Sequence, residues 1–239
     1  MSVYSNKEIL AAIDNGTIVC TPFNSKNVSE ASLDFTLGFN FYKQEYDEIS
    51  RVYNPFDEAE VDRYFKGPLT AVPHAEWCKR HGFREFQNIP PDHPIIVLKP
   101  GERILAHTHE FVGIRAHGGA AEVKSRSSWG RNGVAVCFDA GWVDPGYINR
   151  ITLEIYNLNK HESVVLPVGE RVGQLIFHHT GPVDGGYAGG RDGVSGKYQH
   201  TDDLDELIKT WRPEMMLPRA FKDKRNRPAE IAGLSEGVQ

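Results

Sequence analysis

The residues that could do chemistry gather around one stretch of the sequence, from Gly133 to Asn157. Glu154 interrupts an apolar run near the end of this stretch. Because side chains alternate along a strand, Glu154 is expected on one face with Thr152 and Tyr156, opposite its aliphatic neighbours. A lone glutamate in such a run is most often part of the solvent face of a half-buried strand. Asp144 in the same stretch, and a polar run just before it, favour a functional carboxylate instead.

The polar run covers residues 124–131, KSRSSWGR. Its adjacent serines, its glycine and its arginines can offer hydroxyl groups, backbone N–H groups and guanidinium forks to phosphate oxygens. Loops rich in serine and arginine are common, so this run by itself is a weak indication of phosphate binding.

Metal ligation has little support in the sequence. The histidine pairs at positions 107 and 109 and at positions 178 and 179 have no carboxylate or cysteine at a supporting ligand spacing. His74 and Glu76 match the first half of the zinc deaminase motif, H-x-E, but the second half, P-C-x-x-C, is absent. We therefore expect chemistry without zinc.

Composition limits the class of protein. The chain has 239 residues, 40% of them hydrophobic, and a net charge of −5, which allows one ample core and argues against a general nucleic-acid binder. Three widely spaced cysteines predict neither a disulfide framework nor a metal knuckle, so a reducing compartment fits. No apolar run approaches the roughly 20 residues of a membrane span, and no signal peptide is recognisable. We expect a cytoplasmic protein with no membrane and no nucleic-acid partner.

The elements expected to position the polar residues are mostly short strands separated by turns rich in glycine, proline and asparagine. Runs typical of strands cover residues 32–42, 95–98, 103–106, 111–115, 121–124, 134–138, 151–156, 163–166 and 172–178. Residues 134–138 and 151–156 are predicted to form a hairpin around the turn-rich segment between them. Many short strands of this kind predict an antiparallel sandwich or a barrel-like β fold.

Helices are expected mainly at the two ends of the chain. Ser5 begins a capping box, and Asn15–Gly16 ends the short helix that follows it. Residues 203–206 can cap a second helix, which presents Leu204, Leu207, Ile208 and Trp211 on one face and ends before Pro213.

The remaining segments are less regular. Residues 46–94 form an excursion with a short helical piece at 75–81. The glycine-rich segment 181–196 is either a lid that orders on a ligand or a plain linker. The chain from Arg219 onward is charged and weakly patterned, and partial disorder is expected there.

Several blocks of sequence, taken in order, resemble the dCTP deaminase branch of the dUTPase superfamily. The strongest are 126–131 (RSSWGR), 140–147 (AGWVDPGY) and 151–154 (ITLE), and further support comes from 33–38 (LDFTLG), 173–175 (GQL) and 196–199 (GKYQ). The resemblance runs with gaps from Tyr4 to Thr201, whereas residues 44–92 and the chain after Thr201 match little. It implies a mainly β, dUTPase-like distorted barrel or double-sheet fold with a short N-terminal helix and a C-terminal helix. Residues 1–201 would form the family domain, with an insertion at about 44–92, and residues 202–239 would form a C-terminal helix and tail.

One residue separates the deaminases from the dUTPases, which lack a glutamate at the position of Glu154. In the deaminases this residue is the general acid/base. Water must add to C4 of cytosine and ammonia must leave, so a group has to accept a proton from water and return it to the base. Without zinc, a carboxylate of raised pKa has to do this, and the apolar neighbours of Glu154 would help to raise its pKa.

The resemblance assigns the other roles. Ser127 and the backbone carbonyl of Ala140 would hold the attacking water, and Arg131 would support Glu154 and the ring electrostatically. Asp144 would take the 3′-hydroxyl, Tyr147 would exclude a 2′-hydroxyl, and Tyr187 would close on the nucleotide. Further nucleotide contacts would come from Arg126, Ser128, Thr152, Leu153, Gln174, Lys197 and Tyr198, with Mg²⁺ carried by the triphosphate rather than by protein ligands. Ordinary strand packing is the alternative role for Gln174 and Tyr147.

Two positions depart from the family pattern: Trp129 replaces the usual leucine, and Thr201 replaces a glutamine that contacts the nucleotide. The function expected is deamination of dCTP to dUTP and ammonia by a homotrimer with sites between subunits. The alternatives are a bifunctional enzyme that goes on to dUMP and diphosphate, which the blocks at 140–147 and 151–154 resemble more closely, and a non-catalytic deoxynucleotide sensor.

Overall fold

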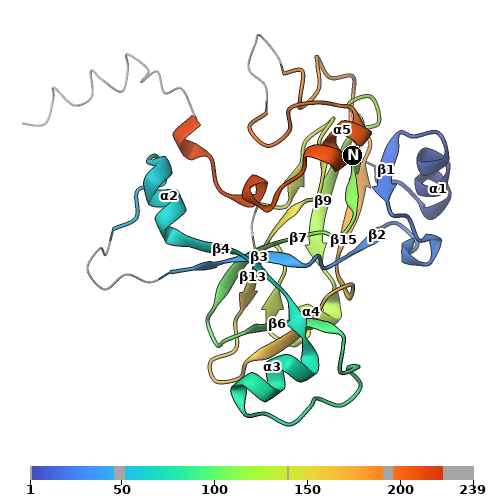
Figure 1. Ribbon diagram of the computed structural model, residues 1–239. Helices are drawn as coiled ribbons and strands as arrows, with labels where there is room; N and C mark the ends of the chain where they lie inside the picture. Colours follow the sequence, from blue (N-terminus) through green and yellow to red (C-terminus); the bar gives the residue numbers. More distant parts are fainter. Residues whose placement is uncertain (1, 46–51, 139, 191–195, 223–239) are drawn as a thin grey trace, which may run out of the picture.

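The structure is a computed structural model that describes residues 2–45, 52–138, 140–190 and 196–222. Within these ranges the chain is mainly β, with its strands in antiparallel sheets and short helices at the periphery (Figure 1). The predicted fold class is confirmed. No described helix combines the length and the apolarity needed to cross a membrane.

The sheet that carries Glu154 has the strand order β10-β13-β7-β3-β4. These strands are β10 (Val134–Ala135), β13 (Thr152–Asn157), β7 (Arg103–His107), β3 (Asn40–Gln44) and β4 (Phe65–Thr70). Strand β13 pairs along most of its length with β7, placing Glu154 opposite Leu105 and Tyr156 opposite Arg103. Residues of β13 alternate between buried and partly exposed, and Glu154 is on the partly exposed face as predicted.

The predicted hairpin is wrong in its extent. Strand β10 has two residues, and both pair with the end of β13. The segment between them leaves this sheet: β11 (Trp142–Val143) pairs with β9 (Ala120–Ser125), and β12 (Ile148–Asn149) pairs with β8 (Phe111–Ile114). Alternating hydrophobicity identified the strands but contained no information about their partners.

The other sheets complete the core. The sheet β11-β9-β15-β2 contains β15 (Arg171–His178) and β2 (Leu33–Thr36), the sheet β1-β8-β12 contains β1 (Ile18–Thr21), and the sheet β14-β6-β5 contains β14 (Val164–Pro167), β6 (Pro94–Leu98) and β5 (Val72–Pro73). Their inner faces bury one large cluster that includes Phe35, Leu98, Ile104, Leu153 and Phe177. Burial of this apolar surface is the main favourable contribution to folding.

The strand predicted over residues 32–42 is in fact two strands in different sheets, β2 and β3. The chain bends between them at Gly38, whose N–H donates to the carbonyl of His107. A Cβ at Gly38 would overlap the His107 ring, so a glycine is needed where the backbone crosses from one sheet to the next. A sequence pattern that alternates through such a bend does not reveal it.

Two of the predicted helices agree with the structure. Helix α1 (Asn6–Asp14) has the capping box formed by Ser5 and Glu8. Helix α5 (Leu204–Thr210) is capped by Asp203 and ends before Pro213, but Ile208 is exposed rather than sharing the buried face. The buried face of α5 packs its Leu207 against Phe111 and Ile148.

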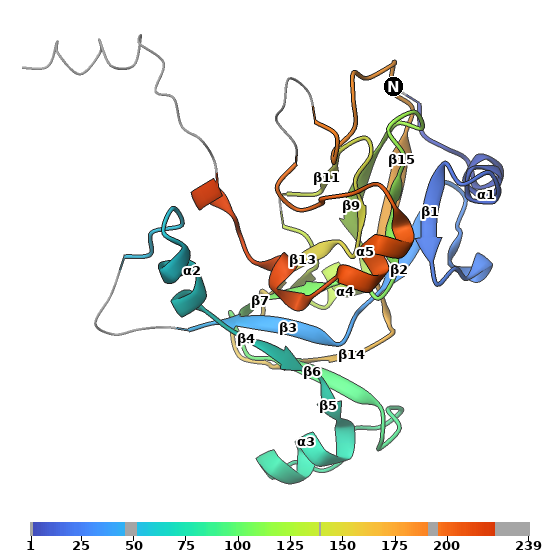
Figure 2. The same cartoon turned by 45° about the horizontal axis from the view of Figure 1, so that its top comes forward.

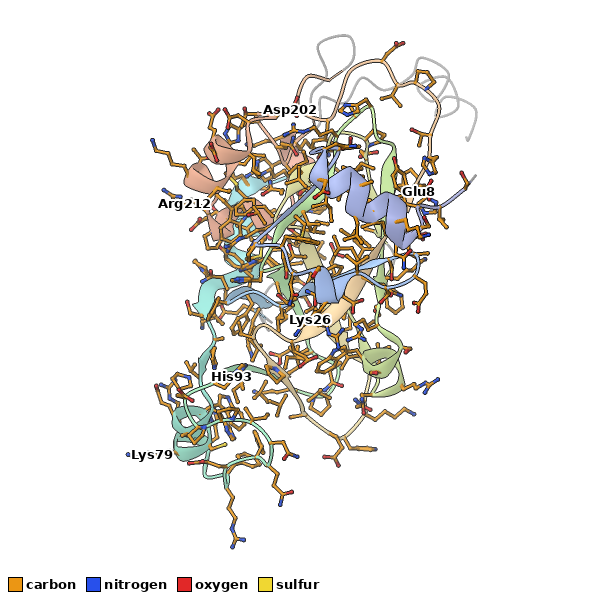
Figure 3. All side chains as sticks on the ribbon, turned by 90° about the vertical axis from the view of Figure 1, so that its right-hand side faces the viewer. Glu8, Lys26, Lys79, His93, Asp202 and Arg212 are labelled. Atoms are coloured by element: carbon orange, nitrogen blue, oxygen red, sulfur yellow. The ribbon has the colours of Figure 1, made fainter. Side chains whose placement is uncertain are left out.

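Residues 52–94 are more regular than expected. They contain α2 (Glu58–Tyr64), β4, β5 and α3 (His74–His81), the last at the predicted position. Helix α3 forms a lobe at one end of the molecule, with Lys79 far from Asp202 at the other end (Figure 3). A hydrogen bond of 2.8 Å between His93 Nε2 and the carbonyl of Val168 ties this lobe to the body.

The C-terminal segment crosses the body from α5 towards α2 (Figure 2). Its Met216 is buried in a cluster with Tyr42, Val61, Phe65 and Leu105, so it packs on the region that the family blocks leave unmatched. Part of the predicted tail, residues 219–222, is therefore held in place, and residues 223–239 lie outside the described ranges. The division of the chain at residue 201 stays a prediction.

A buried amide at the end of β13 gives a test of the fold. The side chain of Asn157 donates to the carbonyls of Leu98, Lys99 and Glu162 at 3.1, 3.1 and 2.9 Å. Replacing Asn157 with alanine should lower the free energy of unfolding by about 2–3 kcal/mol, because buried carbonyls lose their donor. Urea unfolding at a fixed protein concentration measures this. The exposed Lys160→Ala change should stay within about 0.5 kcal/mol of wild type, and an equally small effect of Asn157→Ala would contradict the role assigned to the amide.

Candidate active site

A pocket of about 560 Å³ opens on the polar face of β13. Its floor is formed by strands β13 and β7 with Phe65 of β4, and its walls come from the segment after β10, the glycine-rich segment and the C-terminal segment. The lining residues are Phe65, Arg103, Leu105, Val123, Cys137, Phe138, Ala140, Trp142, Val143, Asp144, Tyr147, Ile151, Thr152, Glu154, Tyr156, Tyr187, Tyr198, Met216 and Pro218. The volume is in the range of small-molecule sites, and the lining combines aromatic surface with a few polar groups.

Glu154 is the central titratable group of this pocket. Burial raises the pKa of its carboxyl, against the opposing effects of its own backbone N–H, the positive charge of Arg103 and the Cys137 thiol. The Cys137 thiol donates to Glu154 Oε2 at 3.9 Å, a long contact even for sulfur. A carboxyl with a raised pKa can both accept and return a proton near neutral pH, which suits a general acid/base.

Three predicted nucleotide-binding residues form another part of the pocket: Asp144, Tyr147 and Tyr187. The rings of Tyr147 and Tyr187 meet edge to face with centroids 4.8 Å apart. Burial raises the pKa of the Tyr147 hydroxyl, so it stays protonated and can act as a donor. Gly146 has φ +89°, and a Cβ there would lie 2.8 Å from the backbone nitrogen of Tyr187, so glycine permits this close approach.

The family block at 196–199 is anchored to the turn around Gly146. Gln199 is buried, and its side chain accepts from Ile148 N at 2.7 Å and donates to Gly146 O at 3.0 Å. Asn149 donates to the carbonyl of Tyr198 at 3.0 Å. These bonds bring Tyr198 to the pocket.

The C-terminal segment fixes the same block from outside. Arg219 donates from Nη1 to the carbonyl of Lys197 at 2.7 Å and from its backbone N–H to the Tyr198 hydroxyl at 3.2 Å. Its guanidinium also lies over the Tyr198 ring, 5.7 Å from the centroid. Lys197 itself does not line the pocket.

Ala140 and Thr152 also line the pocket, whereas the remaining predicted residues lie outside it. The run at 124–131 was predicted to be a loop, but it contains the short helix α4 (Ser127–Arg131), on which Ser127, Ser128 and Arg131 are exposed and outside the pocket. This helix was not predicted, because serine and glycine have lower helix propensities than residues such as alanine and leucine.

A second polar cluster lies just before α4. Arg126 Nε is 3.3 Å from the carboxylate of Asp34, which Arg171 also contacts at 3.2 Å. Gln174 accepts a hydrogen bond from the Ser32 hydroxyl at 3.2 Å, so its amide lies in the same sheet as Asp34. Arg126 and Gln174 thus belong to a patch separate from the pocket in one chain.

Leu153 is fully buried on the core face of β13, so a contact with the nucleotide would have to come from its backbone.

The described residues contain no group of three or more histidine, cysteine or acidic side chains that could hold a metal ion. His107 is a packing residue: it accepts from Asn40 N at 3.2 Å and is 2.8 Å from the Thr108 carbonyl, and burial lowers its pKa to about 4.

Several pocket residues were missed by the sequence analysis. Arg103 and Tyr156 are cross-strand partners on β7 and β13, and Cys137 lies in the segment after β10. Phe65 and Met216 come from segments without family blocks, so nothing in the pattern pointed to them. For Tyr156 a signal did exist, because alternation already put it on the face of Glu154.

Comparison with known proteins identifies the family. The sequence model described as dCTP deaminase-like matches residues 3–180. A protein of Methanopyrus kandleri named dCTP deaminase, dUMP-forming, is 33% identical over 85% of this chain and 93% of its own length. A protein of the same name from Methanosphaera stadtmanae is 34% identical over 74% of this chain and 79% of its own length. The chain belongs to the dCTP deaminase-like family, as its sequence blocks predicted.

Among solved structures, the 2′-deoxycytidine 5′-triphosphate deaminase of Agrobacterium tumefaciens aligns with a TM-score of 0.49 and 20% identity. The alignment covers 73% of this chain and 47% of that one, so the matched part spans about half of that protein.

Proposed function

We propose that the protein converts dCTP to dUMP, ammonia and diphosphate, by deamination followed by cleavage between the α- and β-phosphates. The observation that carries the deamination step is Glu154, a half-buried carboxyl of raised pKa in a nucleoside-sized pocket. The names of the relatives, dUMP-forming, favour this bifunctional reaction over the release of dUTP that the sequence analysis placed first.

In the deamination step, Glu154 would accept a proton from a water molecule as its oxygen adds to C4 of cytosine. That proton would then pass to N3 of the ring, and the second proton of the added water would be carried, again through Glu154, from the C4 hydroxyl to the amino nitrogen. The C4–N bond breaks, ammonia leaves, and the carbonyl of uracil forms. Ala140, which lines the pocket, could hold the water through its backbone carbonyl.

The other groups assigned to this step, Ser127 and Arg131, would come from a second copy of the chain. Both are exposed on α4 and neither lines the pocket of its own chain. A trimer with sites between subunits would bring them to the Glu154 of a neighbour. This arrangement would bring the Ser127 hydroxyl and the Arg131 guanidinium of one chain to the pocket of another.

The triphosphate would extend from the sugar towards Arg126, Ser128 and Gln174 of the same second copy, since these residues lie outside the pocket of their own chain. Lys197 and Tyr198 would approach from the anchored block. No cluster of carboxylates among the described residues suits Mg²⁺, so the ion would arrive with the triphosphate and balance its charge.

The direct test is to incubate the protein with dCTP and Mg²⁺ and to separate the products by chromatography. We expect dUMP, ammonia and diphosphate. Accumulation of dUTP would leave deamination standing and refute the second step. Cleavage of dUTP with dCTP unchanged would refute the role of Glu154, and binding without any turnover would favour the nucleotide sensor.

A further inference from the structure

Arg103 is a charged pocket residue to which neither the family blocks nor the proposed mechanism gives a role. It begins β7, and its cross-strand partner is Tyr156, two residues beyond Glu154 on β13. Diagonal neighbours in an antiparallel pair are within reach of long side chains. Among the described residues that line the pocket, Arg103 is the only cation, and Glu154 and Asp144 are the only carboxylates.

The guanidinium of Arg103 is held by several fixed contacts. Its Nη1 donates to the Tyr156 hydroxyl at 3.0 Å, and its Cζ lies 5.6 Å from the centroid of the Tyr156 ring. When the Gln44 amide is oriented to satisfy its neighbours, its oxygen accepts from Arg103 Nε and Nη2, each at 3.0 Å, and from the Tyr64 hydroxyl at 3.2 Å. A guanidinium held on several nitrogens loses little freedom on further interaction and keeps its charge at every relevant pH.

We propose that Arg103 is a positioning residue that keeps Glu154 in its carboxylate form before water attack. The proposal deepens the proposed function, because it concerns the same acid/base. Burial alone would favour the neutral acid, which cannot accept a proton from water. A fixed positive charge at the pocket opposes this effect: Arg103 favours the carboxylate, although burial still leaves the pKa of Glu154 raised.

The other titratable groups around Glu154 do not carry a positive charge. Cys137 and Tyr156 lie closest, and Asp144, Tyr147, Tyr187 and Tyr198 line the rest of the pocket. Around Arg103 lie Tyr53 and Tyr64, with Glu60 near Tyr53. Within the described part of one chain, Arg103 is therefore the pocket residue whose positive charge can stabilise the Glu154 carboxylate through a charge–charge interaction.

The sign of the effect on pH dependence follows directly. Activity requires the Glu154 carboxylate, so kcat/KM falls as the pH drops through its pKa. Arg103→Gln removes the charge that favours the carboxylate, so the fall should move to higher pH. We expect a loss in kcat/KM of about fivefold at pH 6 and of less than about twofold at pH 8 relative to wild type.

Two further variants separate charge from packing. Arg103→Lys keeps the charge and should keep the wild-type pH profile, even if its kcat is lower. Lys66→Gln removes a cation from β4 of the same sheet, outside the pocket, and should leave the profile unchanged. Equal displacement of the profile in the Gln and Lys variants, or none in Arg103→Gln, would overturn the proposal.

A measurement that does not need turnover keeps this proposal separate from the proposed function. NMR titration of ¹³C-labelled glutamate carboxyls, with the Glu154 signal assigned through Glu154→Gln, should show Glu154 titrating at higher pH in Arg103→Gln. An unchanged titration would overturn the role of Arg103, whereas failure of the wild-type protein to deaminate dCTP would overturn the proposed function alone. If Arg103→Gln does not fold, Tyr156→Phe, which removes one contact that holds the guanidinium, should move the titration in the same direction, and no movement would overturn the proposal.

Discussion

Replacing Glu154 with glutamine is expected to abolish ammonia release from dCTP while leaving nucleotide binding within a few-fold of wild type. Glutamine has nearly the same shape as glutamate but cannot take a proton from water. Loss of a positioned general acid/base typically lowers kcat by about 10²–10⁴-fold. The rate is measured by coupled detection of ammonia, and binding by calorimetry with dCTP and Mg²⁺.

The control is Glu122→Gln on β9, which makes the same change to a strand carboxylate outside the pocket. It should deaminate dCTP at close to the wild-type rate. Turnover retained by Glu154→Gln would show that another group activates the water. Loss of binding along with turnover would instead mean that the carboxylate mainly holds the base.

The second large effect is the recovery of activity when two inactive variants are combined. Glu154→Gln and Arg131→Gln should each be inactive as pure proteins. If a site takes Glu154 from one copy and Arg131 from the next, a mixed trimer contains some sites with both native residues. Every trimer that contains both variants has one complete site out of three, so material purified on both tags should return about a third of wild-type activity.

The experiment uses co-expression of the two variants with different tags and sequential purification on both. Co-expressing Glu154→Gln with a chain that carries both substitutions is the control, since no complete site can form there. Activity no higher than that control would mean that Glu154 and Arg131 act within one chain, and it would require α4 to move to the pocket. A monomer in light scattering that remained active would exclude the shared site altogether.

Most strands could be predicted from the sequence, because a strand is marked by a local alternation of apolar and polar residues. Alternation of apolar and polar residues located β6, β7, β8, β9, β13, β14 and β15 to within a residue or two. It failed where the outcome depends on distant contacts: residues 32–42 were predicted as one strand, but they separate at Gly38 because the backbone crosses the His107 ring there. The hairpin was overestimated for the same reason, since β13 pairs along most of its length with β7 and only at its end with β10.

The candidate site likewise contains residues that could be predicted from local sequence and residues that could not. Residues on the polar face of β13 and around Asp144 were predicted and do meet in the pocket. Ser127 and Arg131 were predicted but lie outside the pocket of one chain, because residue types and their order do not fix where the short helix α4 lies relative to β13. Phe65 and Met216 could not be predicted at all, since they reach the pocket through segments whose sequence has no recognisable block.

The packing of Met216 on Phe65 has a consequence for what counts as the catalytic unit. The family match ends at residue 180, yet part of the pocket wall is built from residues 198, 216 and 218, and Arg219 fastens the block at 197–198. A shortened chain that stops at the end of the match would retain Glu154 and the whole floor of the pocket, but one side of it would be open to water. In this protein the match to the family model therefore ends before the pocket wall is complete, and a chain cut at residue 180 would lack Tyr198, Met216 and Pro218.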